Sequence, residues 1–276
     1  MAIRIGVQIH PQHSSYDDMA KAAQTADEQG FDTLWTWDHF YPLYGTEDAP
    51  LSREIPQETR KHHLHGAHFE GWTLLTAFAA ITKRIEVGML VTCNSYRNVN
   101  LLADMARTLD HVAHGRAILG IGSGWFEKDY AEYGFEFGTA GSRLKNLAHA
   151  LPVLAKRLNK LHPEPVRHPM PIMIGGGGEK VTLKLVAQYA SIWNYFGTPE
   201  AIAHKISVLD HWCKEVGRNP AEIERSILIS EPEALDNLDA YYDAGIRHFI
   251  WGFGKPFDFT PAKRLMAWRE ARAAHR

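Results

Sequence analysis

Apolar β-type segments and amphipathic helical segments alternate along the whole chain. Eight segments have strand character, and a helical pattern follows each of them; the strand segments are 3–9, 34–38, 85–91, 117–122, 171–174, 191–196, 223–229 and 248–253. Short β-then-α units produce parallel strands, and eight such strands close into a barrel. We therefore predict an α/β protein in which residues 1–276 form a single (β/α)8 TIM-barrel domain.

Two segments depart from the regular alternation. A long irregular stretch runs from Phe40 to His68 after the second strand. After the fourth strand, a short helix near 126–133 precedes a longer one, in which leucines 144, 147, 151, 154 and 158 share a face. Pro152 falls inside the longer helix, where proline costs about 3 kcal/mol, so we expect a kink or a break there. The barrel thus carries a long loop after strand 2 and an extra helical region after strand 4.

Composition excludes several classes of partner. The 276 residues include 30 Lys and Arg against 32 Asp and Glu, so no basic excess indicates nucleic acid or a membrane surface. The N-terminus lacks the apolar region of a signal peptide, and no apolar run reaches membrane-spanning length. Cys93 and Cys213 are too few for a disulfide framework. We expect a cytoplasmic protein whose partner is a small-molecule substrate, with no nucleic acid and no membrane involved.

Four consecutive glycines, Gly175 to Gly178, follow the fifth strand and precede a helix that we expect to begin near Glu179. Glycine lets backbone N–H groups approach an anion, and the helix presents unpaired N–H groups and its positive dipole end to the same place. The run therefore favours a nucleotide or flavin phosphate site. The alternative is a tight turn that binds nothing, for which one glycine would suffice. The run lacks the Gly-Lys-Ser/Thr of a Walker loop.

In a TIM barrel, the active site lies at the carboxyl ends of the strands. Polar residues and glycines gather at these positions in this chain, and for any one of them capping or loop hydrogen bonding is the alternative role. They are Gln8, His10, Asp38, His39, Thr92, Cys93, Asn94, Ser123, Gly175 to Gly178, Asn194, Tyr195, Trp251 and Gly252.

Four histidines, His62, His63, His65 and His68, stand within seven residues of the long loop. Imidazole is a zinc ligand, but the spacing fits neither a helical His-x-x-x-His pair nor a finger with cysteines. We predict no metal site, and we expect this loop to form a wall over the substrate pocket.

Several motifs, in order from residue 3 to about 253, resemble the bacterial luciferase-like flavin oxidoreductase superfamily. Within it, they most resemble the branch that uses the deazaflavin coenzyme F420. The motifs are Trp37-Asp38-His39-Phe40, Glu70-Gly71-Trp72-Thr73, Val91-Thr92-Cys93-Asn94-Ser95-Tyr96-Arg97-Asn98, Leu119-Gly120-Ile121-Gly122-Ser123-Gly124-Trp125-Phe126-Glu127 and Ile174-Gly175-Gly176-Gly177-Gly178-Glu179-Lys180. The chain is shorter than the family pattern between Leu158 and Pro169.

The resemblance implies a role for several residues. Asp38 matches an acidic residue that contacts the cofactor ring, and His39 matches the histidine proposed as acid or base beside it. Histidine suits proton transfer because its side chain titrates near neutral pH. The structural alternative is a histidine that bonds a backbone carbonyl or is oriented by Asp38. The other implied cofactor-binding residues are Leu90, Val91 and Thr92, with a cis peptide at Leu90–Val91, then Gly122, Gly124, Gly176, Gly177 and Gly178.

The implied function is an F420-dependent oxidoreductase that transfers a hydride between the deazaflavin and a small organic substrate. Two alternatives remain: an FMN-dependent monooxygenase of the same superfamily, and a barrel that binds a flavin-like ligand without turnover. Trp125 stands where sugar-phosphate dehydrogenases of the branch carry a catalytic glutamate, so that activity is not expected. The resemblance also implies a homodimer. Arg97, Arg116 and Lys180 are candidates for a basic groove that holds the cofactor's oligoglutamate tail.

Overall fold

A computed structural model describes residues 2–45 and 66–274. Its parallel strands form a closed barrel, because β1 pairs with both β2 and β9 while β3 pairs with β5 across the remaining gap. The short strand β4 (Thr92–Cys93) follows β3 and continues its pairing with β5. The barrel strands are β1 (Arg4–Ile9), β2 (Thr33–Thr36), β3 (Glu86–Met89), β5 (Ala117–Gly122), β6 (Ile172–Gly175), β7 (Ile192–Tyr195), β8 (Glu224–Ile229) and β9 (His248–Phe253). The predicted (β/α)8 architecture is confirmed.

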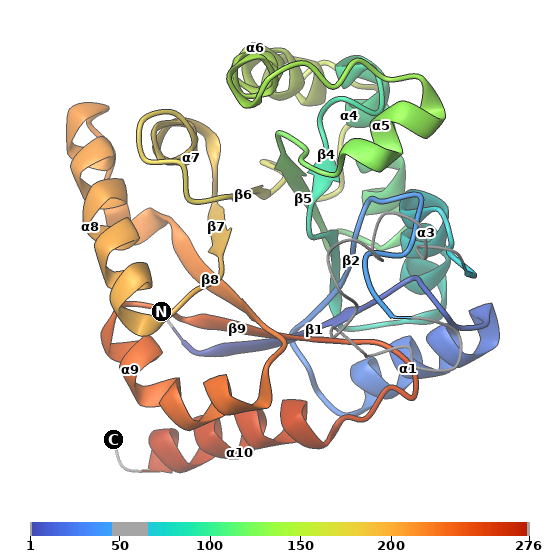
Figure 1. The fold of residues 1–276 in the computed structure, drawn as a ribbon, viewed down its shortest axis with the longest axis vertical. Coiled ribbons are helices and arrows are strands. Elements are labelled where there is room, and N and C mark those ends of the chain that lie inside the picture. Colours follow the sequence, from blue (N-terminus) through green and yellow to red (C-terminus); the bar gives the residue numbers. More distant parts are fainter. Residues whose placement is uncertain (1, 46–65, 275–276) are drawn as a thin grey trace.

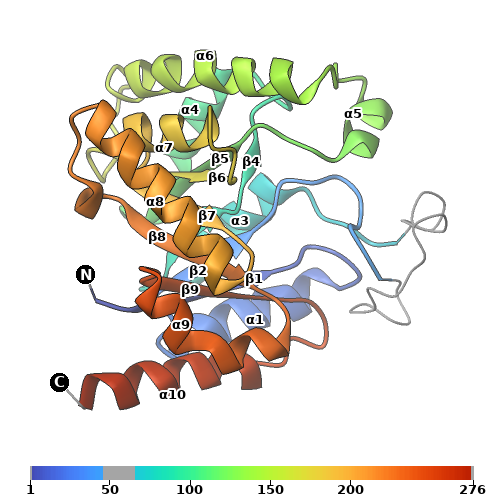
Figure 2. The same cartoon turned by 60° about the vertical axis from the view of Figure 1, so that its left-hand side comes forward.

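Helices surround the barrel, with α1, α9 and α10 on one side and α4, α6 and α7 on the other (Figures 1 and 2). They are α1 (Tyr16–Glu28), α3 (Gly71–Ile81), α4 (Val99–Val112), α5 (Glu127–Tyr133), α6 (Ala140–Leu158), α7 (Thr182–Tyr189), α8 (Pro199–Glu215), α9 (Leu238–Asp243) and α10 (Thr260–Ala274). Short 3-10 turns lie at Pro220–Glu222 and Pro232–Asn237. No helix among the described residues is long and apolar enough to cross a membrane.

The extra helical region after the fourth barrel strand consists of α5 and α6. Helix α6 continues through Pro152, so the expected break is wrong. Leu147, Leu151, Leu154 and Leu158 are buried on one face of this helix. Each buried leucine contributes about 1.5–3 kcal/mol, and together they outweigh the cost of the proline.

Two apolar layers hold the barrel together. The larger layer lies between the outer face of the sheet and the helices, and it includes Phe31, Phe78 and Phe249. A second, smaller cluster lies on the opposite face of the sheet. It contains Leu90, which follows β3, and the strand residues Trp35, Ile118, Met173, Ile192 and Ile250. Filling by such residues makes the barrel interior a packed core rather than a pore.

A polar network crosses the barrel where the strands begin. The Glu224 carboxylate lies 3.1 Å from Arg4 Nη1 and accepts a 2.6 Å hydrogen bond from His248 Nδ1. Arg4 also pairs with Glu86, and the second ring nitrogen of His248 lies 2.8 Å from Thr33 Oγ1. These groups join the first residues of five strands, β1, β2, β3, β8 and β9, at the amino end of the barrel. The carboxyl end remains available for a site.

The Glu224 network predicts acid-sensitive stability. Burial raises the pKa of Glu224, but the hydrogen bond and charge of His248 and the charge of Arg4 outweigh burial and lower it from 4.5 to about 2. A lowered folded-state pKa stabilises the protein above the ordinary pKa, and this stabilisation is lost as pH falls from about 4.5 toward 2. We expect Glu224→Gln to reduce the free energy of unfolding by about 3 kcal/mol at pH 7, and by much less near pH 3.

Urea unfolding followed by circular dichroism at both pH values measures this difference. Glu222→Gln is the matched control, because the Glu222 side chain is 60% exposed in its pair with Arg218. If the difference in the free energy of unfolding between wild type and Glu224→Gln is the same at pH 7 and pH 3, the lowered pKa of Glu224 is contradicted.

Candidate active site

A cavity of about 410 Å³ opens at the carboxyl ends of the strands. Its walls come from the ends of β1, β2, β3, β5, β6, β7 and β8, as the barrel geometry predicts. Eight of the predicted site residues line it: Asp38, His39, Leu90, Val91, Thr92, Gly122, Gly124 and Gly176. Gly177 and Gly178 do not line this cavity; they continue the glycine run beyond the rim.

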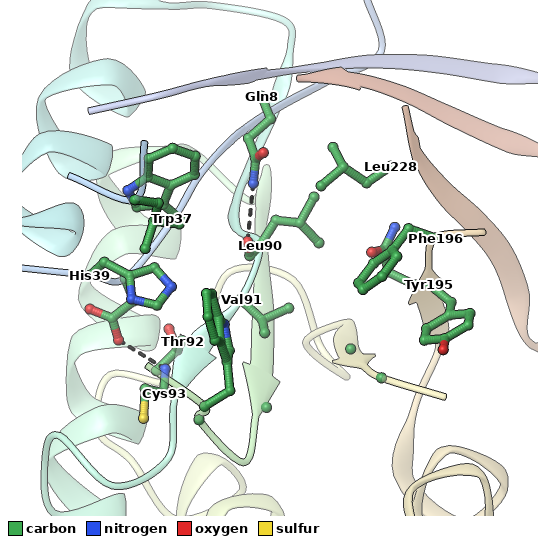
Figure 3. A pocket seen from close by; sticks show the side chains of 18 of the residues that line it. Gln8, Trp37, His39, Leu90, Val91, Thr92, Cys93, Tyr195, Phe196 and Leu228 are labelled. Atoms are coloured by element: carbon green, nitrogen blue, oxygen red, sulfur yellow. Dashed lines mark hydrogen bonds between the residues drawn. The ribbon is translucent and has the colours of Figure 1, made fainter. Parts of the chain in front are cut away.

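The peptide bond Leu90–Val91 is cis, as predicted, and it joins β3 to β4 at the floor of the cavity. Gln8 Nε2 donates a 3.1 Å hydrogen bond to the carbonyl of Leu90 (Figure 3). A Cβ built on Gly122 would lie 2.8 Å from Val91 Cγ2, and one on Gly175 would lie 3.2 Å away. A side chain at Gly122 would therefore collide with Val91, and one at Gly175 would press against it.

His39 is held by a buried carboxylate. Its Nδ1 lies 2.7 Å from Oδ2 of Asp129, a residue of α5 with no solvent exposure. Since an ionised carboxylate only accepts, Nδ1 carries the proton, and Nε2 is the nitrogen that remains for chemistry. Asp129 also accepts hydrogen bonds from the Tyr96 hydroxyl at 2.8 Å and the Phe40 backbone N–H at 3.1 Å. Burial, with the nearby Cys93 and Asp129, raises the pKa of Tyr96, so its hydroxyl stays a donor.

Asp38 does not orient the neighbouring histidine, which corrects that alternative. Its carboxylate is buried and accepts from Arg97 Nη2 at 3.0 Å and from the backbone N–H of Cys93 at 3.0 Å. Arg97 lies 3.5 Å from Glu70 as well. Asp38 thus fixes the end of β4 beside the cavity, while Asp129, which the sequence analysis missed, holds His39.

Two of the three residues predicted for the basic groove, Arg97 and Arg116, are engaged by other groups of the protein. Arg97 is neutralised by Asp38. Arg116 precedes β5 at the amino end of the barrel, where it donates to the carbonyls of Ala79 at 2.9 Å and Ile85 at 2.6 Å. It therefore lies at the end opposite the cavity. Lys180 is exposed and follows the glycine run.

The loop that contains the glycine run is longer than predicted, because α7 begins at Thr182 rather than near Glu179. The segment between them is anchored on α8: the Glu179 carboxylate lies 2.6 Å from Lys205 Nζ, and Trp212 Nε1 donates to the Glu179 carbonyl at 2.7 Å. Hydrogen bonds to Lys205 and His204 lower the pKa of Glu179. The loop thus has a fixed outer end.

Close packing also fixes the inner end of the glycine run. A Cβ built on Gly177 would lie 2.5 Å from the ring of Tyr195, and one on Gly178 would lie 2.7 Å from Thr182 Oγ1. Gly176 has a φ of +124°, a conformation that favours glycine. Three of the four glycines are therefore required by the local packing and backbone conformation of the loop.

His68 is the one member of the histidine group within the described residues; His62, His63 and His65 lie outside them. Burial, and to a lesser extent His39, lowers the pKa of His68 to about 3, so its ring is neutral. Its Nε2 accepts a 3.1 Å hydrogen bond from the indole N–H of Trp37. Among residues 2–45 and 66–274, no group of three His, Cys, Asp or Glu side chains could hold a metal.

The structure is thus a parallel (β/α)8 barrel whose cavity lies at the carboxyl ends of the strands and is lined by a histidine that a buried carboxylate holds. The family model described as "Luciferase-like monooxygenase" matches residues 1–275. The chain belongs to this family.

Comparisons with individual proteins agree with the family and the fold. An uncharacterized protein of Mycobacterium tuberculosis (strain H37Rv) is 22% identical over 249 residues, which cover 84% of this chain and 86% of that protein. The F420-dependent glucose-6-phosphate dehydrogenase of Amycolatopsis mediterranei is 26% identical over 207 residues, or 68% of this chain and 54% of the relative.

Among solved structures, an F420-dependent secondary alcohol dehydrogenase with an F420-acetone adduct superposes with a TM-score of 0.79 at 18% identity, covering 95% of this chain and 97% of that one. The monooxygenase RslO1 from Streptomyces bottropensis gives a TM-score of 0.69 at 14% identity over 99% of each chain. At these identities, both likenesses concern the fold.

Proposed function

We propose that this protein is a coenzyme F420-dependent oxidoreductase that transfers a hydride between the deazaflavin and a small organic substrate. The observation that carries the proposal is that His39, held by the buried Asp129 carboxylate, lines the same cavity as the backbone of Leu90 to Thr92 and the glycines Gly122 and Gly176. F420-dependent enzymes among both the relatives and the structural neighbours support the choice of cofactor.

The cavity fits such a cofactor. Its volume of about 410 Å³ lies in the range of small-ligand sites, and Leu90, Val91 and Thr92 give it a strand-like floor. Gly122 and Gly176 leave backbone, rather than side chains, at the adjoining walls. The glycine run beyond the rim would hold the phosphate. When bound, the deazaflavin supplies or accepts a hydride at a carbon of its ring.

The chain's own residues would manage the proton. Reduction of a carbonyl consumes one proton, and oxidation of an alcohol releases one, so a group near the reacting oxygen must give or take it. His39 is suited to this role because Asp129 fixes its tautomer and leaves Nε2 to exchange the proton with the substrate. Trp37 lines the cavity beside His39 and limits water there.

Asp129 should act on turnover through His39 rather than through binding. We expect Asp129→Asn to lower kcat about tenfold while KM stays within about threefold, because the amide no longer fixes the histidine tautomer. Steady-state kinetics measure both constants. Asp104→Asn is the control, since Asp104 pairs with Arg107 and Arg157 on the outer helices. A rise in KM with an unchanged kcat would place Asp129 outside proton transfer.

Anaerobic turnover assays test the proposed reaction against its alternatives. Oxidised F420 is mixed with a panel of alcohols, and reduced F420 with the matching carbonyl compounds, while cofactor absorbance is followed. We expect substrate-dependent conversion of F420 in at least one pair. Parallel assays in air use reduced FMN; oxygen-dependent product formation there, without conversion of F420 in the anaerobic assays, would favour the monooxygenase alternative. Tight binding without turnover in any pair would favour a non-catalytic barrel.

A further inference from the structure

The space around His39 is aromatic. Trp125 has its ring centroid 5.6 Å from that of His39 at 72°, and Trp37 lies 6.3 Å away at 76°. Both indoles line the cavity. A molecule that exchanges a proton with His39 therefore lies near the indole rings of Trp37 and Trp125.

Trp125 is also unusually exposed for so large an apolar side chain. It is 63% exposed, and so is Phe196, which lines the cavity from the end of β7. Figure 3 shows Phe196 and Tyr195 on one side of the cavity and His39 and Trp37 on the other, with Leu90 between them. Exposed aromatic side chains at the wall of a cavity mark a surface that a ligand covers.

The described lining of the same cavity carries no lysine or arginine that could pair with an anionic ligand. The guanidinium of Arg97, just behind the wall, is already bound by Asp38 and Glu70. An anion placed next to His39 would lose water without gaining a positive partner, which is strongly unfavourable.

We propose that the substrate is a neutral molecule with an apolar ring next to its carbonyl or hydroxyl group, and that Trp125 is the residue that selects it. This inference rests on the proposed function for the reaction, but it concerns only which molecules the cavity accepts. Trp125 covers the ring of the substrate, while the polar group lies toward His39. Phosphorylated and carboxylated molecules are rejected for lack of a cation.

The test uses two probes that differ by one charge: acetophenone and 4-acetylbenzoate. Each is titrated by calorimetry into the full-length protein saturated with F420, and into the cofactor-free protein. We expect acetophenone to bind at least about tenfold more tightly than 4-acetylbenzoate, a difference of about 1.4 kcal/mol. Trp125→Ala should weaken acetophenone about tenfold, whereas Trp125→Phe should retain affinity within about threefold.

Leu101→Ala is the matched control, because Leu101 is a 54% exposed apolar residue on α4 and does not line the cavity. Equal affinity for the two probes, absence of binding by either, or an unchanged acetophenone affinity in Trp125→Ala would overturn the inference. A failure of the proposed function gives a different result. In that case F420 would not bind, but the cofactor-free protein would still bind acetophenone more tightly than 4-acetylbenzoate.

Discussion

Replacing His39 with alanine is expected to lower turnover by about 100-fold or more, the usual scale for a lost general acid or base. Cofactor affinity should remain within a few fold, because the cis-peptide floor and the glycines form the cavity without this ring. The effect exceeds that expected for Asp129→Asn, since that variant keeps the imidazole and loses only its support. Single-turnover kinetics with reduced F420 and the substrate found in the assays above measure the chemical step directly.

His149→Ala is the control for this variant, because His149 is an exposed residue of α6 away from the cavity. It should behave as wild type. If His39→Ala turns over at the wild-type rate, His39 has no part in proton transfer, and another group must be sought among the polar residues of the cavity.

Replacing Gly177 with valine is expected to weaken F420 binding at least about 30-fold, or about 2 kcal/mol. A Cβ at this position would lie 2.5 Å from the ring of Tyr195, so the glycine run must move away from the positions that expose its backbone N–H groups. Outward movement is restricted because Glu179, two residues on, is tied to Lys205. Fluorescence titration of the variant with F420 measures the loss.

Two comparisons make this result specific. Gly141→Val introduces the same side chain in α6, where the nearest atom is 3.7 Å from the new Cβ, and should leave affinity unchanged. The same deazaflavin without its phosphate should bind wild type and Gly177→Val alike. Equal losses for both ligands would show that Tyr195 closes the ring pocket, and full retention of F420 affinity would show that the run is only a turn.

The barrel could be predicted because its signal is local and repeated. The bounds of β5 (Ala117–Gly122) and β9 (His248–Phe253) coincide with the predicted segments, since strands buried on both faces are nearly continuous apolar runs. Helix α6 could not be predicted as one piece, because its continuity through Pro152 depends on leucines packed against other elements. Local propensity yields to such packing.

The rim position of Asp38 and His39 followed from the barrel, but their partners did not. Asp129 is 90 residues from His39 in the chain, and Arg97 is 59 residues from Asp38. No spacing rule connects such pairs, and an acidic residue beside a histidine in the sequence is a natural but wrong first choice. The start of α7 at Thr182 could not be predicted either. Its N-cap residue is Val181, whose side chain cannot accept a capping hydrogen bond and so gives no sequence signal.

The choice of cofactor is the central claim, and parallel titration with F420 and FMN tests it most directly. Purified full-length protein is titrated with each cofactor in its oxidised form, and the cofactor and tryptophan fluorescence are followed under identical conditions. We expect saturable F420 binding in the micromolar range or tighter, with FMN at least about tenfold weaker. Micromolar binding of FMN without binding of F420 would contradict it.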